Sequence, residues 1–323
     1  MVDELVIGSR GSELALWQAE WVKSELTDAY QSVKIEIKTI KTKGDLILDK
    51  PIPLIGGKGV FTKEIEQALL SEEIDIAVHS CKDLPTEMTE GLSIGAIPLR
   101  ETASDVLITK DGKGLDSMSP NSVIASGSLR RTAQLLSYRE DLKVVDIRGN
   151  VPTRLRKFNE SDWEGLILAY AGLKRLDLLN ENCIILDHKI MLPAVAQGAL
   201  ALQIRSDDKQ ISDTISALND KDSSDAVTAE RSLLRRLQGG CQVPIGAISR
   251  VENNELKIEA QITELNGVKA VRDSLSGDRE DAEKLGIELA EKLLWNGGEE
   301  ILSEIRESEN FGTAPEAEKL SIE

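Results

Sequence analysis

A cysteine at position 241 is the residue whose setting most favours covalent chemistry. It lies in Gly239-Gly240-Cys241-Gln242-Val243-Pro244, where two glycines without Cβ atoms open the backbone and a proline fixes it just beyond. We therefore expect the thiol on an accessible bend, where a bulky group can be attached. Free cysteine is also among the most buried residue types, so the same segment fits a thiol that only packs beyond a helix end.

Basic residues are concentrated between Ser128 and Lys157, although the chain as a whole is acidic. Eight basic and three acidic side chains give this segment an excess of five positive charges, whereas the 323 residues together carry a net charge of −17. Several lie beside expected strand ends and helix starts, where free N–H groups attract anions. Because a guanidinium binds both oxygens of a carboxylate, this predicts a site for a polycarboxylate. The alternative is a solvated surface of ion pairs. The residues beside strand ends are Ser128, Arg130, Arg131 and Arg148, and Arg154 is another of the eight basic residues.

Lys82 and Asp83 follow a short apolar run, residues 74–78, that is expected to be a buried strand. A carboxylate at such a strand end, near arginines, stays ionised and can stabilise a developing cation or move a proton. The alternative is an ordinary surface turn. The chain has two histidines and three cysteines, too few metal-binding side chains for a cluster, and we expect no metal site.

Two further segments place polar or basic residues near expected helix starts. Ser9-Arg10-Gly11-Ser12 separates a strand over 4–8 from a helix over 13–29, and Ser12 is the expected N-cap. Gly56-Gly57-Lys58-Gly59 precedes a helix over 62–70 and is expected to form a mobile loop with one cation. It lacks the spacing of a phosphate loop, and neither a dinucleotide-binding nor a serine-hydrolase motif occurs at a strand end.

The elements that must position these residues follow an α/β pattern through about residue 200. From about residue 247 two strands precede two helices, which predicts a separate α+β domain. A helix over 225–237 is expected before Cys241, with Ser223 or Ser224 as N-cap and Gly239 as its stop. The other expected strands cover 33–37, 105–109, 122–126, 143–147, 166–169, 255–263 and 268–276, and the last two helices cover 282–295 and 299–307.

Composition narrows the possible partners and the compartment. A hydrophobic content of 41% supports globular cores, whereas the net charge of −17 and 3% aromatic residues argue against nucleic acid and anionic membranes. No apolar run is long enough to span a membrane, and the N-terminus has no secretory pattern. Three widely separated cysteines favour free thiols in a reducing compartment. We therefore expect a cytoplasmic protein, and we expect it to be a monomer.

In combination, these segments resemble the porphobilinogen deaminase (hydroxymethylbilane synthase) family. The likeness runs through nearly the whole chain, in the same order along the sequence. The segments that carry it are Ile7-Gly8-Ser9-Arg10, Leu14-Ala15-Leu16-Trp17-Gln18-Ala19, Gly56-Gly57-Lys58-Gly59, Ala77-Val78-His79-Ser80 with Lys82-Asp83, Ser128-Leu129-Arg130-Arg131, Arg148-Gly149-Asn150, Thr153-Arg154-Leu155, Gln197-Gly198-Ala199 and Gly239-Gly240-Cys241-Gln242-Val243-Pro244. This sequence departs from the family at Ala196, where glycine is frequent, and at Cys81, where methionine or leucine is usual.

The resemblance implies two lobes of the type II periplasmic-binding-protein kind around a cleft, with a small α+β domain that carries the cofactor cysteine. Lobe 1 is expected to comprise 1–98 and 195–220, lobe 2 to comprise 99–194, and the third domain 221–307, before a flexible tail over 308–323. The implied activity is a transferase reaction of tetrapyrrole (heme) biosynthesis. Four porphobilinogen molecules are condensed head to tail with loss of ammonia, on a dipyrromethane joined to Cys241 by a thioether, and hydroxymethylbilane is released by hydrolysis.

The resemblance also assigns roles to individual residues. Asp83 matches the catalytic aspartate, which also contacts the cofactor and would stabilise the cation formed when the amine leaves. The residues that match cofactor-carboxylate positions are Lys82, Ser128, Arg130, Arg131 and Arg154. Those that match substrate-side positions are Arg10, Ser12, Arg148, Arg154 and Arg175, and Lys58 and Phe61 fall in the mobile loop.

Two other classes of protein fit parts of the pattern. A non-enzymatic carboxylate-binding protein of the same lobed fold would also place arginines in a cleft, but it would need neither the Gly-Gly-Cys segment nor a third domain. The effector domain of a transcriptional regulator would share the fold, but the sequence has no evident helix-turn-helix segment or basic tail.

Overall fold

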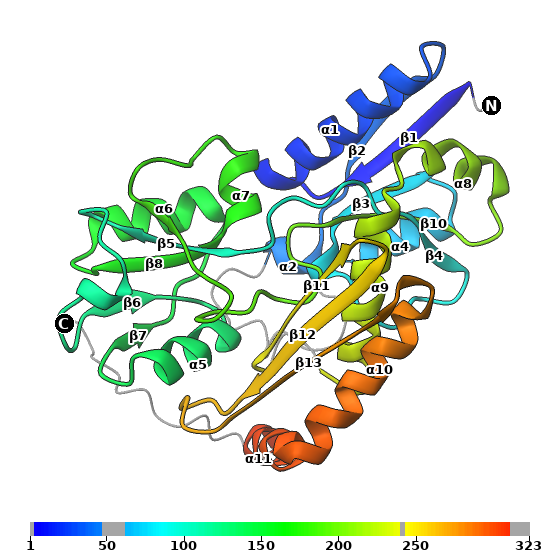
Figure 1. The fold of residues 1–323 in the computed structure, drawn as a ribbon. Coiled ribbons are helices and arrows are strands. Elements are labelled where there is room, and N and C mark those ends of the chain that lie inside the picture. The colour runs from blue at the N-terminus through cyan, green and yellow to red at the C-terminus, as the bar shows by residue number, and fades with distance from the viewer. Residues whose placement is uncertain (1–2, 47–61, 240–242, 311–323) are drawn as a thin grey trace.

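The first lobe is built on a five-stranded sheet with the order β2-β1-β3-β10-β4 (Figure 1). The computed structural model describes residues 3–46, 62–239 and 243–310. β1 is parallel to β2 and β3, whereas β10 is antiparallel to both of its neighbours. The strands are β1 (Glu4–Ser9), β2 (Lys34–Thr39), β3 (Ile76–Ser80), β4 (Leu92–Ala96) and β10 (Leu200–Arg205).

Helices cover both faces of this sheet because alternate strand residues are apolar on each side. α1 (Glu13–Ala29) and α8 (Lys209–Ile215) share one core with Leu5 and Ile7, and α4 (Lys63–Leu70) packs on the opposite face. A short helix, α2, covers Lys43–Leu46. The expected N-cap of α1 is confirmed, because the Ser12 side chain accepts a hydrogen bond from the backbone of Ala15 at 3.3 Å.

The second lobe has a mixed sheet with the order β7-β6-β8-β5-β9. β6 is parallel to β7 and β8, and β5 runs antiparallel to β8 and β9. Leu107 faces a core that includes residues of α5, and Val106 faces another that includes residues of α6 and α7. The elements are β5 (Asp105–Thr109), β6 (Val123–Ala125), β7 (Lys143–Val145), β8 (Gly165–Ala169), β9 (Cys183–Ile185), α5 (Leu129–Tyr138), α6 (Val151–Glu160) and α7 (Tyr170–Arg175).

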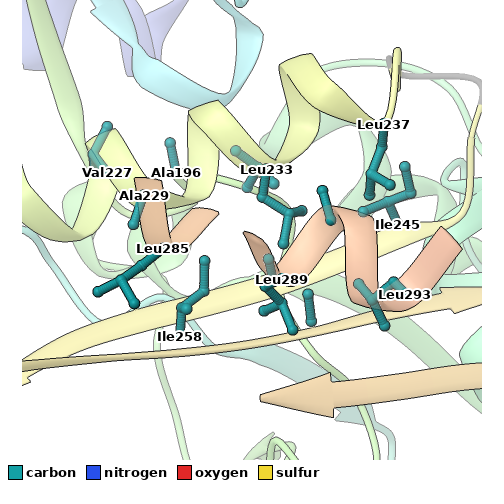
Figure 2. Close-up of a cluster of buried hydrophobic side chains, with 14 of the residues drawn as sticks. Ala196, Val227, Ala229, Leu233, Leu237, Ile245, Ile258, Leu285, Leu289 and Leu293 are labelled. Carbon is teal, nitrogen blue, oxygen red and sulfur yellow. The ribbon is translucent and has the colours of Figure 1, made fainter. Parts of the chain in front are cut away.

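The third unit is an antiparallel sheet, β11-β12-β13, packed on long helices. Figure 2 shows part of its core, a buried cluster to which Leu233 of α9, Leu289 of α10 and Ile258 of β12 all belong. The helices approach closely at Gly286, where an added Cβ would lie 2.1 Å from the backbone oxygen of Ala229. The elements are α9 (Lys221–Arg236), β11 (Ile245–Glu252), β12 (Glu255–Thr263), β13 (Ala270–Asp278), α10 (Ala282–Leu293) and α11 (Glu299–Asn310). The expected fold class, with two α/β lobes and a small α+β domain, is confirmed.

The start expected for the helix before Cys241 was wrong. α9 begins at Lys221, because the side chain of Asp220 caps it by accepting a hydrogen bond from the backbone of Ser223 at 2.8 Å. The Ser223 hydroxyl instead accepts a hydrogen bond from the backbone of Arg100 at 2.8 Å. The residue in the left-handed conformation after the helix is Gln238, with φ 51°. The sequence analysis also did not predict β4, β9, β10 and β11.

Single helical turns complete the described secondary structure. They include the turn that follows β3, which carries Lys82 and Asp83. The 3₁₀ turns are Cys81–Asp83, Leu115–Ser117, Ser216–Leu218 and Arg279–Asp281, and a π-helical turn covers Leu294–Gly298.

Candidate active site

Lys82 and Asp83 lie in the 3₁₀ turn at the end of β3, as the sequence predicted. Cys81, with 0% of its surface exposed, anchors this turn, and its backbone donates to the carbonyl of Ala199 at 2.9 Å. Asp83 is exposed, whereas Lys82 is partly buried. Burial lowers the pKa of the Lys82 amine to about 8, and its Nζ lies 3.3 Å from Oε1 of Gln197. The turn therefore presents a carboxylate beside a poorly solvated cation.

Two arginines of α5 meet a buried acid that the sequence analysis did not single out. Arg130 Nη1 donates to Asp105 Oδ2 at 2.7 Å, and Arg131 donates to Asp105 Oδ1 from Nε at 3.1 Å and from Nη2 at 2.8 Å. Burial opposes ionisation of Asp105, but the two guanidinium groups outweigh it and hold the pKa well below its usual range. The two arginines share one carboxylate.

Gln197 links this ion pair to the turn at Asp83. Its side-chain amide donates to Asp105 Oδ1 at 2.9 Å, and its oxygen accepts the hydrogen bond from Lys82. Three cations of the cluster are therefore arranged around one buried acid and one amide.

The start of α6 adds two more arginines. Asn150 caps the helix by accepting a hydrogen bond from the backbone of Thr153 at 2.9 Å. Arg154 Nε donates to the carbonyl of Gly149 at 2.7 Å. Burial and, after it, the nearby charges of Arg131 and Arg148 together lower the pKa of Arg154 to about 10, whereas the charge of Asp83 acts in the opposite direction. These electrostatic couplings place Arg154 in the same neighbourhood as α5 and Asp83.

The substrate-side residues expected from the sequence do not all lie in this cluster. Arg10 follows β1, and the charges of Arg10 and Asp83 both act on buried His79. Ser12 uses its oxygen to cap α1. Arg175 Nη2 donates to the carbonyl of Gly198 at 2.7 Å, and its guanidinium lies 6.0 Å from the ring centre of Trp17. Arg175 is therefore bound to the segment that returns to the first lobe.

Ser128 lies at the N-cap position of α5, as expected, but its side chain makes no capping hydrogen bond. Its backbone N–H donates to the Ser126 hydroxyl at 3.3 Å. Cys241, Lys58 and Phe61 lie outside the described residues. On either side of the Cys241 segment, Leu237 and Ile245 belong to the same core.

A second buried acid, Glu230 of α9, joins the third unit to both crossover segments between the lobes. It accepts hydrogen bonds from Arg100 Nη1 at 2.6 Å and Nη2 at 3.1 Å, and from the backbone of Ala196 and Ser249 at 2.7 Å each. Arg100 Nε also donates to the carbonyl of Gln197 at 2.8 Å. The sequence signal was an acid on the apolar face of α9, where a buried charge requires partners.

This geometry defines a protein with two α/β lobes that gathers cations beside one exposed acid. Charge-assisted hydrogen bonds to carboxylates are the interactions that such a cluster forms best. No group of three or more metal-binding side chains was found in the described ranges. Among the same residues, no helix is both long enough and apolar enough to cross a membrane.

Comparison with known proteins identifies the family. Residues 5–213 match the model described as porphobilinogen deaminase, dipyromethane cofactor binding domain, and residues 225–295 match the porphobilinogen deaminase C-terminal domain. The chain belongs to the porphobilinogen deaminase family. It is therefore a transferase of porphyrin and heme biosynthesis that uses a dipyrromethane cofactor, and the alternative of a non-enzymatic binding protein is not favoured.

Named relatives with similar sequences match this chain over almost their full length, and solved structures match part of it. A porphobilinogen deaminase of Chlorobium phaeobacteroides (strain BS1) is 46% identical over 312 residues, which cover 95% of this chain and 100% of that protein. One from Geobacter sulfurreducens is 49% identical over 308 residues, covering 95% and 96%. Among solved structures, the methionine-binding protein MetQ is similar over 67% of this chain and 90% of that chain, with 13% identity and a TM-score of 0.44.

The described residues fit a cofactor that carries carboxylates. Arg130 Nε is buried and has no hydrogen-bond partner in the part of the chain that the structure describes. Lys82, whose pKa is lowered by burial, also gains from an added anion. A carboxylated group supplies the acceptors and the negative charge that Asp105 alone does not provide.

Proposed function

We propose that the cations around Asp83 hold the carboxylates of the dipyrromethane and of porphobilinogen, while Asp83 performs the chemistry. The observation that carries this proposal is the arrangement of Lys82, Arg130 and Arg131 around the single buried carboxylate of Asp105. Such a cluster attracts anions, and it leaves the Asp83 carboxylate exposed beside it. Arg130 Nε is a buried donor with no hydrogen-bond partner among the described residues, and an added carboxylate would satisfy it.

Asp83 is assigned the stabilisation of positive charge. When bound, the dipyrromethane supplies the pyrrole carbon to which porphobilinogen units are added. As the bond to the departing ammonia breaks, positive charge spreads into the pyrrole ring of the substrate, and an ionised carboxylate beside the ring N–H stabilises it. Asp83 is suited to this role because the 3₁₀ turn fixes its backbone while its side chain stays exposed.

The basic residues are assigned to the carboxylates of the cofactor and of the substrate. Lys82, Arg130 and Arg131, with Ser128 at the start of α5, are proposed to hold the cofactor. Arg154 lies close enough to both Arg131 and Arg148 for their charges to lower its pKa, which supports its assignment to cofactor and substrate alike. Arg10 and Arg148 are assigned to the substrate side.

Ser12 and Arg175 are also proposed for the substrate side, and each makes a structural contact as well. The Ser12 oxygen caps α1, and one Arg175 amino group binds Gly198. Cys241 is proposed as the thioether attachment point, and Lys58 and Phe61 are proposed to belong to a loop over the site.

We further propose a cytoplasmic monomer that binds neither nucleic acid nor membrane. The net charge of −17 supports the absence of polyanionic partners. Lobe limits at 98–99, 194–195 and 220–221 fit the two crossovers and the start of α9 at Lys221.

The substitution Asp83→Asn tests the assignment of the catalytic role. It keeps the side-chain shape and removes the charge, so we expect the cofactor to remain attached by intact mass while porphobilinogen turnover falls by about 10²- to 10⁴-fold. Asp162→Asn, on an exposed residue of the second lobe, is the control and should keep normal turnover. Near-normal turnover by Asp83→Asn would refute the catalytic role assigned to Asp83.

A further inference from the structure

The turn that carries Asp83 is held by its own strand and by the returning strand segment. The backbone of Cys81 donates to Ala199 O at 2.9 Å, and the backbone of Leu84 donates to Cys81 O at 3.2 Å. The first contact holds the start of the turn, and the second is the hydrogen bond that closes it. Just beyond Asp83, the chain is hydrogen-bonded to a residue of α9.

That residue is Arg231 of α9. Its Nη1 donates to the carbonyl of Leu84 at 3.0 Å, and its Nη2 donates to the carbonyl of Pro85 at 2.5 Å. Arg231 is partly buried, and its charge also acts on the thiol of Cys81, whose pKa burial raises to about 11. Because the guanidinium is planar and its donors are fixed relative to one another, two carbonyls bound to it keep a defined separation and direction.

α9 is itself held in place by hydrogen bonds at the residue next to Arg231. The preceding residue, Glu230, accepts four hydrogen bonds from Arg100, Ala196 and Ser249, and its surface is 0% exposed. Neighbouring side chains of one helix therefore reach the crossover segments and the turn at Asp83. α9 ends at Arg236, five residues before Cys241 in the sequence. The same helix thus connects the Asp83 turn with the segment that bears the proposed attachment point.

We propose that Arg231 is a positioning residue that sets the place of Asp83 relative to the domain carrying Cys241. It acts through the backbone of Leu84 and Pro85 and does not contact the substrate. This inference rests on the role proposed above for Asp83. Removing the guanidinium frees the two carbonyls and lets the turn shift against α9. A displacement of about 1 Å from a productive geometry can cost about a hundredfold in rate.

The first test replaces Arg231 by methionine, which keeps a long unbranched side chain without donors. We expect turnover of porphobilinogen to fall by about tenfold to a hundredfold, with little change in KM and with the cofactor still attached by intact mass. Arg236→Met is the matched control, because Arg236 lies on the same helix and binds Glu291 in an exposed ion pair. Loss of the attached cofactor, or a rise in KM without a fall in turnover, would overturn the proposal.

A double-mutant cycle separates positioning from a general structural role. In Asp83→Glu the carboxylate is already displaced by one methylene, so adding Arg231→Met should cost much less than it does in the wild type. Additive losses in the two backgrounds would overturn the proposal. If Arg231→Met does not fold, Arg231→Lys, which can reach only one carbonyl at a time, serves in the same cycle. Normal turnover by Asp83→Asn would instead refute the role of Asp83, whatever Arg231 does.

Discussion

Replacing Asp105 by asparagine tests how far the two buried arginines depend on one carboxylate. Asp105 is 0% exposed, and Arg130 and Arg131 are each 5% exposed. The three arginine hydrogen bonds to Asp105 measure 2.7, 3.1 and 2.8 Å. Asparagine keeps the shape of the side chain, but it removes the charge and directs an amide N–H towards a guanidinium.

The cost follows from leaving buried charges without a partner. Removing one member of a buried ion pair destabilises a protein by about 3 to 5 kcal/mol, and we expect Asp105→Asn to lower the free energy of unfolding by about that amount. Asp141→Asn is the matched control. Its partner Arg139 donates to it at 2.7 and 2.8 Å, but the Asp141 side chain is 37% exposed, so solvent replaces the lost contact and stability should change little.

Urea unfolding at several pH values provides the assay. Because Arg130 and Arg131 hold the pKa of Asp105 below its usual range despite its burial, the stabilisation is complete above the unfolded-state pKa of about 3.9. It is lost as the pH falls below that value towards the folded-state pKa. The difference between wild type and Asp105→Asn should therefore be constant from about pH 7 to 5 and shrink below about pH 4. A difference no larger than that of the control, or one that grows in acid, would refute this reasoning.

Lys82 and Gly286 give two further tests. Burial lowers the pKa of the Lys82 amine to about 8. In the protein without its cofactor, acylation of Lys82 should therefore have a midpoint near pH 8. Exposed Lys34, whose pKa is raised by its hydrogen bond to a glutamate, should react only at higher pH. Mass spectrometry of the labelled peptides would contradict this if both lysines reacted over the same pH range. Because a Cβ at Gly286 would lie 2.1 Å from a backbone oxygen of α9, Gly286→Ala should lower the free energy of unfolding by about 1 to 3 kcal/mol. Gly114→Ala, with no atom within 4 Å of the added Cβ, should have little effect, and equal stability of the two variants would argue against the close contact.

Local patterns in the sequence were sufficient to place much of the candidate site. An apolar run of strand length predicted that Lys82 and Asp83 follow a buried strand, and they follow β3. Strand and helix boundaries likewise placed Ser128 and the two arginines after it at the start of α5. These predictions depend on neighbouring residues, which local pattern describes well.

The acids that organise the site could not be found in this way. Asp105 lies 25 and 26 residues from its arginines, and Glu230 lies 130 residues from Arg100. A signal was nevertheless present in each case, because Asp105 directly precedes the apolar run Val106-Leu107-Ile108 in a buried strand and Glu230 lies on the buried face of α9. A charge in such a place must be paired, although the sequence does not show with which residue.

The capping error at α9 has a similar cause. Asp220 and Ser223 are both residue types that cap helices, and local pattern alone does not distinguish them. The fold decides between them, because the Ser223 hydroxyl binds the backbone of Arg100 on the crossover segment. Ala196, which stands where the family often has glycine, is another position whose role is set by the fold. Its φ of 58° lies in the left-handed region, and its backbone donates to Glu230.

The most direct test of the proposed site is the intact mass of the purified chain, read together with its reaction with Ehrlich's reagent. We predict an adduct of two linked pyrroles on the wild-type protein that is absent from Cys241→Ser. A wild-type chain with only the mass of its amino acids and no colour with the reagent would contradict a carboxylated oligopyrrole held on Cys241 beside Asp83.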